Sequence, residues 1–261
     1  MISLSYLDLV FASLFLVAAG ILSFFLKLNT EKALAVAASR MVIQLLLLGL
    51  ILKTIFTFVN IWVFFLMAGV MVFAAGFEIL SRQKYRFKGI ETFLIGTGTM
   101  GMITFTISFL TLFFIIAKKP WYTPQYAIPL LGMMLGNTMN GISIGLDRLS
   151  GTIVDQKRVI EARLMLGETA AQAVTGIRKD SIKSGMIPLI NSMSAAGLVT
   201  LPGMMTGQIL AGAPPVEAVK YQILIMFLIA ACSALGTICA VTFASKRFFD
   251  SRDRLRLERL K

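Results

Sequence analysis

The sequence predicts an all-α polytopic membrane protein with about seven transmembrane helices, its N-terminus outside and its C-terminus in the cytoplasm. Hydrophobic side chains make up 57% of the 261 residues and charged ones only 15%, whereas soluble domains carry about 25% charged residues. The charges fall in clusters between long uncharged stretches. Because roughly 20 apolar residues cross a bilayer as a helix, the chain has the length for about seven crossings and one sizeable loop.

Uncharged apolar runs give the positions of the predicted crossings, all within a single permease domain. They cover residues 7–26, 37–59, 61–80, 92–117, 126–146, 186–212 and 221–245. Lys53 and Glu78 stand near the ends of the second and third runs, and Pro202-Gly203 breaks the sixth. Six crossings therefore remain an alternative to seven.

Basic residues predict the orientation, because cytoplasmic loops hold the excess of Lys and Arg. Alternate connections carry 21 of the 25 Lys and Arg residues, and the connections between them carry four. This asymmetry fits an odd number of crossings in the plasma membrane, which is the inner membrane of a bacterium. The net charge of +12 suits anionic membrane lipids, so no nucleic-acid partner is needed to explain it.

Several chemistries are excluded by residue counts and context. Histidine, the commonest metal ligand and general base, is absent. Cys232 and Cys239 stand seven apart in an apolar run, where they are expected to pack. Gly96, Gly98 and Gly101 match a dinucleotide-binding pattern but lie inside an apolar run. The sequence has no P-loop motif, so we expect no catalytic residue and no bound cofactor, and any ATP and Mg would belong to a partner. Metal ligands stay unknown.

Residues 147–185 form the one long connection and are predicted to be a cytoplasmic coupling loop. They hold seven basic and five acidic side chains. Thr152 and Thr169 each begin a capping box, which starts a helix. Gly167 lies where a left-handed residue would end the first helix. The loop is therefore predicted to be a helix, a Gly elbow and a second helix.

The same loop resembles the cytoplasmic signature of ABC-type importers, which reads E-A-A, three residues, Gly, nine residues, Ile-x-Leu-Pro. The chain departs from it at Arg163, Lys179 and Asp180. In that family the signature docks into the ATPase subunit, and a plain structural connector is the alternative. The resemblance implies these ATPase-coupling residues: Glu161, Ala162, Gly167, Thr169 and Ile177.

Longer stretches resemble the FetB family of ABC transporter membrane subunits, which includes bacterial iron exporters and plant aluminium-tolerance proteins. These stretches are residues 128–137, 166–170, 197–207 and 217–222. The resemblance implies a permease that exports iron or another metal ion, forms a homodimer, uses a separate ATP-binding subunit and is associated with oxidative-stress resistance. A stand-alone carrier or ion channel coupled through Glu78, and an exporter of a non-metal solute such as a nucleotide sugar, remain alternatives.

Polar residues in the fifth crossing are candidates for the translocation path. Met133, Asn137 and Asn140 share one helical face. Amide oxygens and a thioether offer hard and soft ligands to a metal ion. Gly141 and Gly145 form part of a G-x-x-x-G pattern, so close packing with Asn as interhelical glue is the structural alternative.

The sixth crossing is expected to break at Pro202 and Gly203, because proline removes a helical hydrogen bond and glycine permits a sharp turn. Discontinuous helices in transporters often mark the substrate site, and a simple kink is the alternative. The polar and sulfur-bearing residues near this break complete the predicted path: Asn191, Ser194, Met204 and Met205.

Residues 246–261 carry seven basic and three acidic side chains interleaved with apolar ones. This pattern predicts an amphipathic extension of the last helix into the cytoplasm. A solvated or lipid-surface position is expected for it, with docking to a partner as the alternative.

Overall fold

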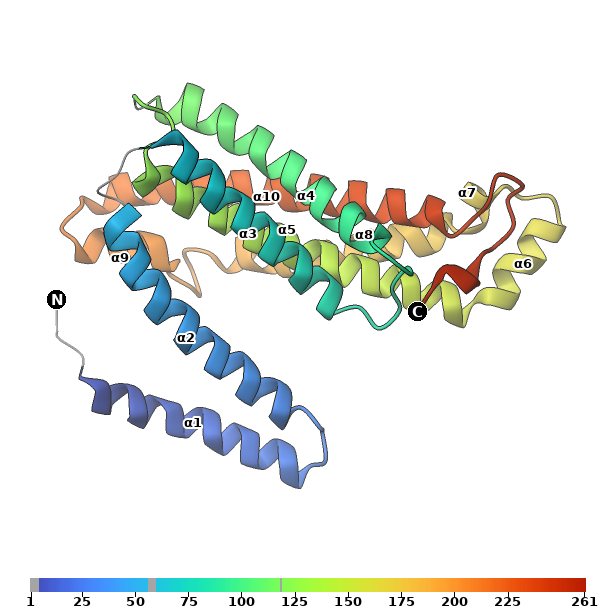
Figure 1. Ribbon diagram of the computed structural model, residues 1–261, viewed down its shortest axis with the longest axis horizontal. Helices are drawn as coiled ribbons and strands as arrows, with labels where there is room; N and C mark the ends of the chain where they lie inside the picture. Colours follow the sequence, from blue (N-terminus) through green and yellow to red (C-terminus); the bar gives the residue numbers. More distant parts are fainter. Residues whose placement is uncertain (1–4, 56–59, 118) are drawn as a thin grey trace. The chain divides into compact units, whose positions relative to one another are not determined.

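The computed structural model describes residues 5–55, 60–117 and 119–261 (Figure 1). The described residues fold into ten α-helices: α1 Tyr6–Phe25, α2 Glu31–Ile55, α3 Ile61–Ser81, α4 Glu91–Leu110, α5 Pro124–Asp155, α6 Lys157–Met165, α7 Ala170–Ala173, α8 Thr175–Ala195, α9 Gly203–Leu210 and α10 Pro215–Arg247. A π-helical segment, η1 Thr111–Ile116, extends α4, and a 3-10 turn, η2 Leu257–Arg259, lies near the C-terminus. The predicted permease domain comprises two compact units, Met1–Val59 and Asn60–Lys261, which are described separately.

The first unit is a helical hairpin of α1 and α2. Ser5 and Asp8 form a capping box that begins α1. At the turn, the Ser23 hydroxyl lies 2.7 Å from the Thr30 hydroxyl and 3.5 Å from a carboxylate oxygen of Glu31. Most apolar side chains of both helices are exposed in the chain, as is typical of helices that face lipid.

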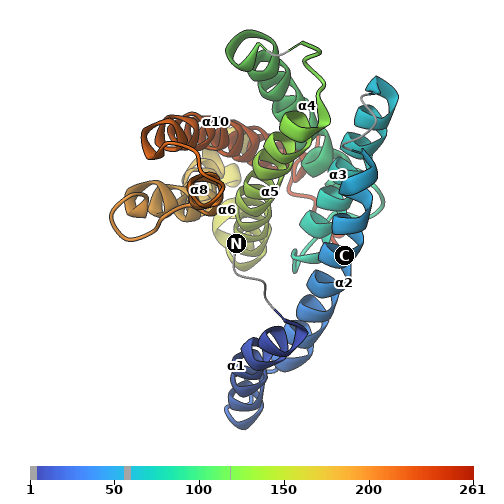
Figure 2. The same ribbon diagram turned by 90° about the vertical axis from the view of Figure 1, so that its left-hand side faces the viewer.

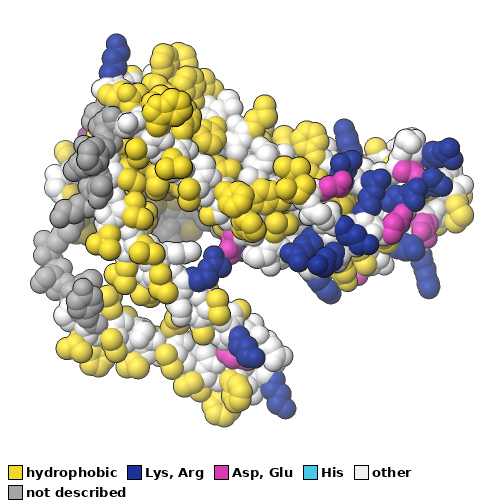
Figure 3. Space-filling view, viewed as in Figure 1, with side chains coloured by type: hydrophobic (Ala, Val, Ile, Leu, Met, Phe, Trp, Pro, Cys, Tyr) yellow, Lys and Arg dark blue, Asp and Glu magenta, His cyan; other side chains and the backbone are white. Residues whose placement is uncertain are grey.

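The second unit is built around α5. Figures 1 and 2 show α5 running between its neighbours, and it contacts α3, α4, α8 and α10. Its buried face includes Leu131, Met134, Ile142 and Leu149. Most charged side chains on the visible surface of this unit gather at the end that holds α6, whereas apolar ones predominate along the rest of the bundle (Figure 3).

Five of the described helices are long and apolar enough to cross a membrane. These spans are Leu7–Phe25, Glu31–Leu52, Ile61–Ser81, Glu91–Ile116 and Pro215–Arg247. The fifth and sixth predicted crossings correspond to α5 and to the pair α8 and α9, which contain charged or amide side chains and a helix break. The count of seven crossings and the orientation therefore remain predictions.

Several helices extend beyond the predicted bounds. The second begins at Glu31, and its predicted end at 56–59 lies outside the described residues. The fifth continues to Asp155, because Leu149 and Ile153 bury their side chains and keep the helix packed. The last begins at Pro215, where a proline at the first position favours a helix start.

The predicted helical extension at the C-terminus is wrong, because α10 ends at Arg247 and the chain folds back. We call residues 248–261 the C-terminal tail. The Phe248 side chain is fully buried, and its ring lies 4.8 Å from that of Phe87 between centroids. The backbone amide of Lys261 donates to the Arg86 carbonyl at 2.8 Å, and the amide of Lys88 donates to the Arg259 carbonyl at 2.7 Å. Pairing with the α3–α4 loop thus replaces the predicted helix.

Candidate functional site

The predicted coupling hairpin is present, although its first helix begins later than expected. Thr152 lies inside α5, so the predicted capping box there is wrong, and α6 begins at Lys157 after a turn at Gln156. Packing of α5 outweighs the local cap, because the helix continues through the fully buried Ile153. The elbow between α6 and α7 then follows at Gly167 (Figure 1).

Two local motifs form the elbow as predicted. Gly167 has a φ of +93°, a left-handed conformation that glycine adopts without steric cost. The amides of Gly167 and Glu168 donate to the carbonyls of Leu164 and Arg163 at 3.1 and 3.2 Å, which completes a Schellman motif. Thr169 then begins α7 with the predicted capping box, in which its amide donates to the Gln172 side chain at 2.9 Å.

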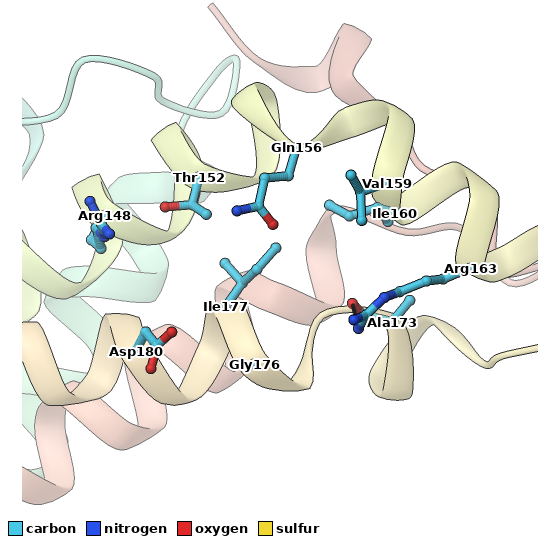
Figure 4. A pocket seen from close by; sticks show the side chains of 10 residues that line it. All are labelled: Arg148, Thr152, Gln156, Val159, Ile160, Arg163, Ala173, Gly176, Ile177 and Asp180. Atoms are coloured by element: carbon cyan, nitrogen blue, oxygen red, sulfur yellow. Dashed lines mark hydrogen bonds between the residues drawn. The ribbon is translucent and has the colours of Figure 1, made fainter.

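The other predicted coupling residues lie on α6 and at the start of α8. Glu161 pairs with Lys157 one turn earlier in α6, with 3.8 Å between Nζ and Oε1. Ala162 is exposed on the same helix. Ile177 is buried in the first turn of α8, and Figure 4 shows it on the opposite side of a pocket from Ile160. These residues therefore come from α6, from the elbow with the start of α7, and from α8, where Ile177 faces the pocket between the arms rather than the elbow.

The pocket between the two arms of the hairpin has a volume of about 200 Å³. Arg163, which departs from the importer signature, donates to the Ala173 carbonyl at 3.4 Å. This contact joins α6 to α7 across the pocket (Figure 4). Arginine at this position therefore has a structural role in holding the hairpin together.

Two apolar residues at the tip of the hairpin were missed by the sequence analysis. Met165 and Leu166 are 83% and 85% exposed, although they lie in the charged part of the chain. An exposed pair of large apolar side chains outside the membrane-spanning segments is typical of a protein contact surface. Both residues directly precede Gly167 in the sequence. Two apolar residues at the predicted end of a cytoplasmic helix are the signal that could have indicated an apolar tip.

The predicted path residues on α5 are at least partly exposed, and both Asn side chains form hydrogen bonds within the chain. The Asn137 side chain donates to the Met133 carbonyl of its own helix at 2.8 Å. The Asn140 side-chain oxygen accepts a hydrogen bond from Arg82 Nη1 at 3.1 Å. Both Asn side chains are exposed, whereas Met133 is half-buried. One face of α5 therefore carries two polar side chains, of which Asn140 lies beside the end of α3.

The Arg82 cluster at the end of α3 was not fully predicted. Arg82 pairs with Glu78 one turn earlier at 3.3 Å, and it also donates to the Asn140 side chain, 58 residues away. The Asp147 carboxylate also accepts from the Lys84 amide at 2.9 Å. These contacts join the end of α3 and the α3–α4 loop to α5 between Asn140 and Asp147.

The sixth predicted crossing is broken earlier and more widely than expected. α8 begins at Thr175, directly after the hairpin, and ends at Ala195. Gly197 has a φ of +87° and turns the chain. Pro202 then precedes α9, which begins at Gly203. The break therefore spans the whole segment between these helices rather than two residues.

The structure brings together only some of the predicted path residues. Met133 and Met204 line the same cavity of about 60 Å³, beside Tyr126 and Tyr221. Met205 is buried next to it along α9. Asn191 and Ser194 are exposed on the last turns of α8 and do not line this cavity. Among the described residues no group of three or more His, Cys, Asp or Glu side chains forms a metal cluster.

Glycines bring α5, α8 and α10 into close contact. A Cβ atom on Gly185 would lie 2.5 Å from the Gly141 carbonyl oxygen and 2.8 Å from Thr237 Cγ2. A Cβ atom on Gly145 would lie 2.9 Å from Val241 Cγ2. Gly141 and Gly145, the two glycines of the G-x-x-x-G pattern, therefore serve helix packing, while the exposed Asn side chains lie on another face.

Comparison with known proteins places the chain in a family. The model of the Uncharacterised protein family (UPF0014) matches residues 6–249. The probable iron export permease protein FetB of Escherichia coli is 32% identical over 254 residues, covering 97% of this chain and 96% of that one. A UPF0014 membrane protein of Synechocystis is 38% identical over 229 residues, covering 87% of each chain.

A plant protein is also similar, Protein ALUMINUM SENSITIVE 3 of Arabidopsis thaliana, which is 30% identical over 231 residues and covers 88% of this chain and 82% of its own. No solved structure gives a significant match. The family match covers almost the whole chain and agrees with its long apolar helices. The chain is therefore a multi-pass integral membrane protein of the UPF0014 family.

Proposed function

We propose that this chain is the permease subunit of an ABC exporter in the inner membrane, and that it moves iron or another metal ion out of the cell. A separate subunit would bind ATP and Mg and hydrolyse the ATP. The observation that carries the proposal is the α6–α7 hairpin, whose tip exposes Met165 and Leu166. Exposed apolar residues on a capped, rigid elbow suit docking to a partner.

The connectivity of the hairpin supports a mechanical role. One arm continues from α5 and the other leads into α8, and both helices carry candidate path residues. These helices meet closely where Gly185 lies against the Gly141 carbonyl. Movement of the hairpin by an ATPase subunit would therefore shift α5 against α8 and change which side of the membrane reaches the path.

Support for a metal ion comes from the relative and from the chemistry of the path. The E. coli relative is named a probable iron export permease. Met133 and Met204, two thioether-bearing residues, line one cavity, and Asn137 and Asn140 add amide groups on α5. Sulfur and neutral oxygen ligands bind a passing metal ion, and an export path needs only weak sites.

We also propose that two permeases pair in the complex, together with two ATPase subunits. Asn137 and Asn140 are exposed in the single chain, and polar groups in contact with lipid are unfavourable. A second copy facing α5 would enclose them in a shared path. We expect the mass of the purified complex to correspond to two permeases and two ATPase subunits.

Co-purification tests the ATPase partnership. The tagged chain is purified in detergent from its native membrane, with and without the double substitution Met165→Asp and Leu166→Asp. Leu198→Asp with Val199→Asp is the matched control, since these apolar residues are 93% and 81% exposed in the loop after α8. An ATPase bearing a Walker A motif should accompany the wild type and the control only. A wild-type chain that purifies alone and moves ions in liposomes would instead support a carrier coupled through Glu78.

A further inference from the structure

The C-terminal tail forms one wall of a groove beside the coupling hairpin. The groove has a volume of about 500 Å³, and it lies between α6 and the tail loop formed by residues 250–255. Leu164 and Met165 contribute apolar surface from α6, and Leu255 contributes it from the tail loop. Figure 1 shows the tail beside the hairpin end of the bundle. The groove therefore joins the exposed tip of the hairpin to a segment more than 80 residues away in sequence.

The tail loop is held in shape by Asp250. Its carboxylate accepts hydrogen bonds from the backbone amides of Arg252 and Arg254, both at 2.9 Å, and from the Arg254 guanidinium at 2.9 Å. The amide of Arg254, followed by that of Arg252, lowers the pKa of this carboxyl well below its usual range. The loop is thus ordered before any partner binds, which reduces the entropy lost on binding.

The two walls of the groove differ in net charge. Glu161 and Glu168 make the hairpin side acidic, whereas Arg252 and Arg254 outnumber the single acid Asp253 on the tail side. Within the described part of the chain, the Arg252 and Glu168 side chains form no ion pair. An apolar floor with unpaired charges at the rim is the usual composition of a protein interface.

We propose that the tail loop is the second half of the docking surface for the ATP-binding subunit. The inference rests on the proposed function, and the groove is continuous with the hairpin tip because Met165 belongs to both. The partner segment would insert an apolar side chain between Met165 and Leu255. It would place an acidic residue toward Arg252 and a basic residue toward Glu168, because complementary charges orient an interface.

This arrangement adds a second route for transmitting movement. The tail is tied to the α3–α4 loop by the backbone hydrogen bonds of Arg86 and Lys88 to its last residues. A partner that moves α6 and the tail together would therefore act on α3 and α4 as well as on α5 and α8. The hairpin itself is continuous with α5 and α8 and also contacts α10 through α7.

Photo-crosslinking in native membranes tests the proposal. A photoreactive amino acid replaces Arg252 in one variant of the full chain and Met165 in another, and Lys220 at the far end of α10 in a control variant. Adducts are identified by mass spectrometry. The charge reversal Arg252→Glu is compared with Lys220→Glu for the amount of ATPase that co-purifies, since both reverse an exposed basic residue.

We expect ATPase adducts from positions 252 and 165, none from 220, and about a fivefold loss of co-purified ATPase for Arg252→Glu alone. Adducts from 165 only, with unchanged co-purification of Arg252→Glu, would overturn the tail inference and leave the proposed function standing. Adducts from 252 with a second copy of this chain or with lipid would also overturn it. Absence of the ATPase from wild-type preparations would remove the proposed function itself.

Discussion

Replacement of Gly185 by alanine tests the packing that joins the hairpin to the bundle. The new Cβ atom would lie 2.5 Å from the Gly141 carbonyl oxygen, whereas favourable contacts between heavy atoms begin at about 3.5 Å. The obstruction is backbone, so the helices themselves must separate by about 1 Å. Overpacking of this kind costs about 1–3 kcal/mol; the rigid neighbour places the cost at about 3 kcal/mol, and the helix propensity of alanine offsets about 1 kcal/mol, which leaves about 2 kcal/mol for Gly185→Ala.

Thermal unfolding of the purified permease in detergent measures this cost. A destabilisation of about 2 kcal/mol should lower the Tm by roughly 4–8 °C, because 1 kcal/mol corresponds to about 2–4 °C in proteins of this size. Gly69→Ala is the control, since Gly69 is exposed on α3 and alanine favours a helix. Equal Tm values for Gly185→Ala, Gly69→Ala and the wild type would refute the close contact between α8 and α5.

Three further substitutions test the elbow, the candidate path and the tail. Gly167→Val should destabilise the elbow conformation by about 1–2 kcal/mol, because valine disfavours positive φ. ATPase activity should then no longer drive transport, although the protein stays in the membrane. Unimpaired export by this variant would contradict the role of the elbow. Asn140→Leu removes the acceptor of Arg82 and should slow metal transport without changing ATPase co-purification, so an unchanged transport rate would exclude Asn140 from the path. Asp250→Asn should speed trypsin cleavage at Arg252 about tenfold at pH 7, because it removes the carboxylate that orders the loop. The pKa of this carboxyl is lowered, so its stabilising effect is present at pH 7 and begins to be lost only when the pH falls below about 4. Equal cleavage of the two proteins would count against the Asp250 turn.

The sequence predicts the hairpin well because its signals are local. A glycine with positive φ and a capping box act within a few residues, and both occur at Gly167 and Thr169. The capping signal at Thr152 fails because the same segment also buries Leu149 and Ile153 in the bundle. Burial of two large apolar side chains outweighs one cap of about 1 kcal/mol.

The remaining errors come from contacts between residues distant in the sequence. The tail follows an amphipathic pattern, yet Phe248 packs on Phe87 and the last residues pair with the α3–α4 loop. Similarly, the bond of Arg82 to Asn140 depends on how α3 packs against α5. Single-sequence patterns do not encode such pairings.

ATP-dependent iron uptake into inverted membrane vesicles tests the central claim most directly. Vesicles that hold the chain and its ATPase partner should accumulate iron only with ATP and Mg, and Gly167→Val should abolish this uptake while both subunits remain in the membrane. Uptake that needs ATP but prefers another solute would change the substrate only. Iron movement by the chain alone, without ATP or an ATPase subunit, would contradict the account.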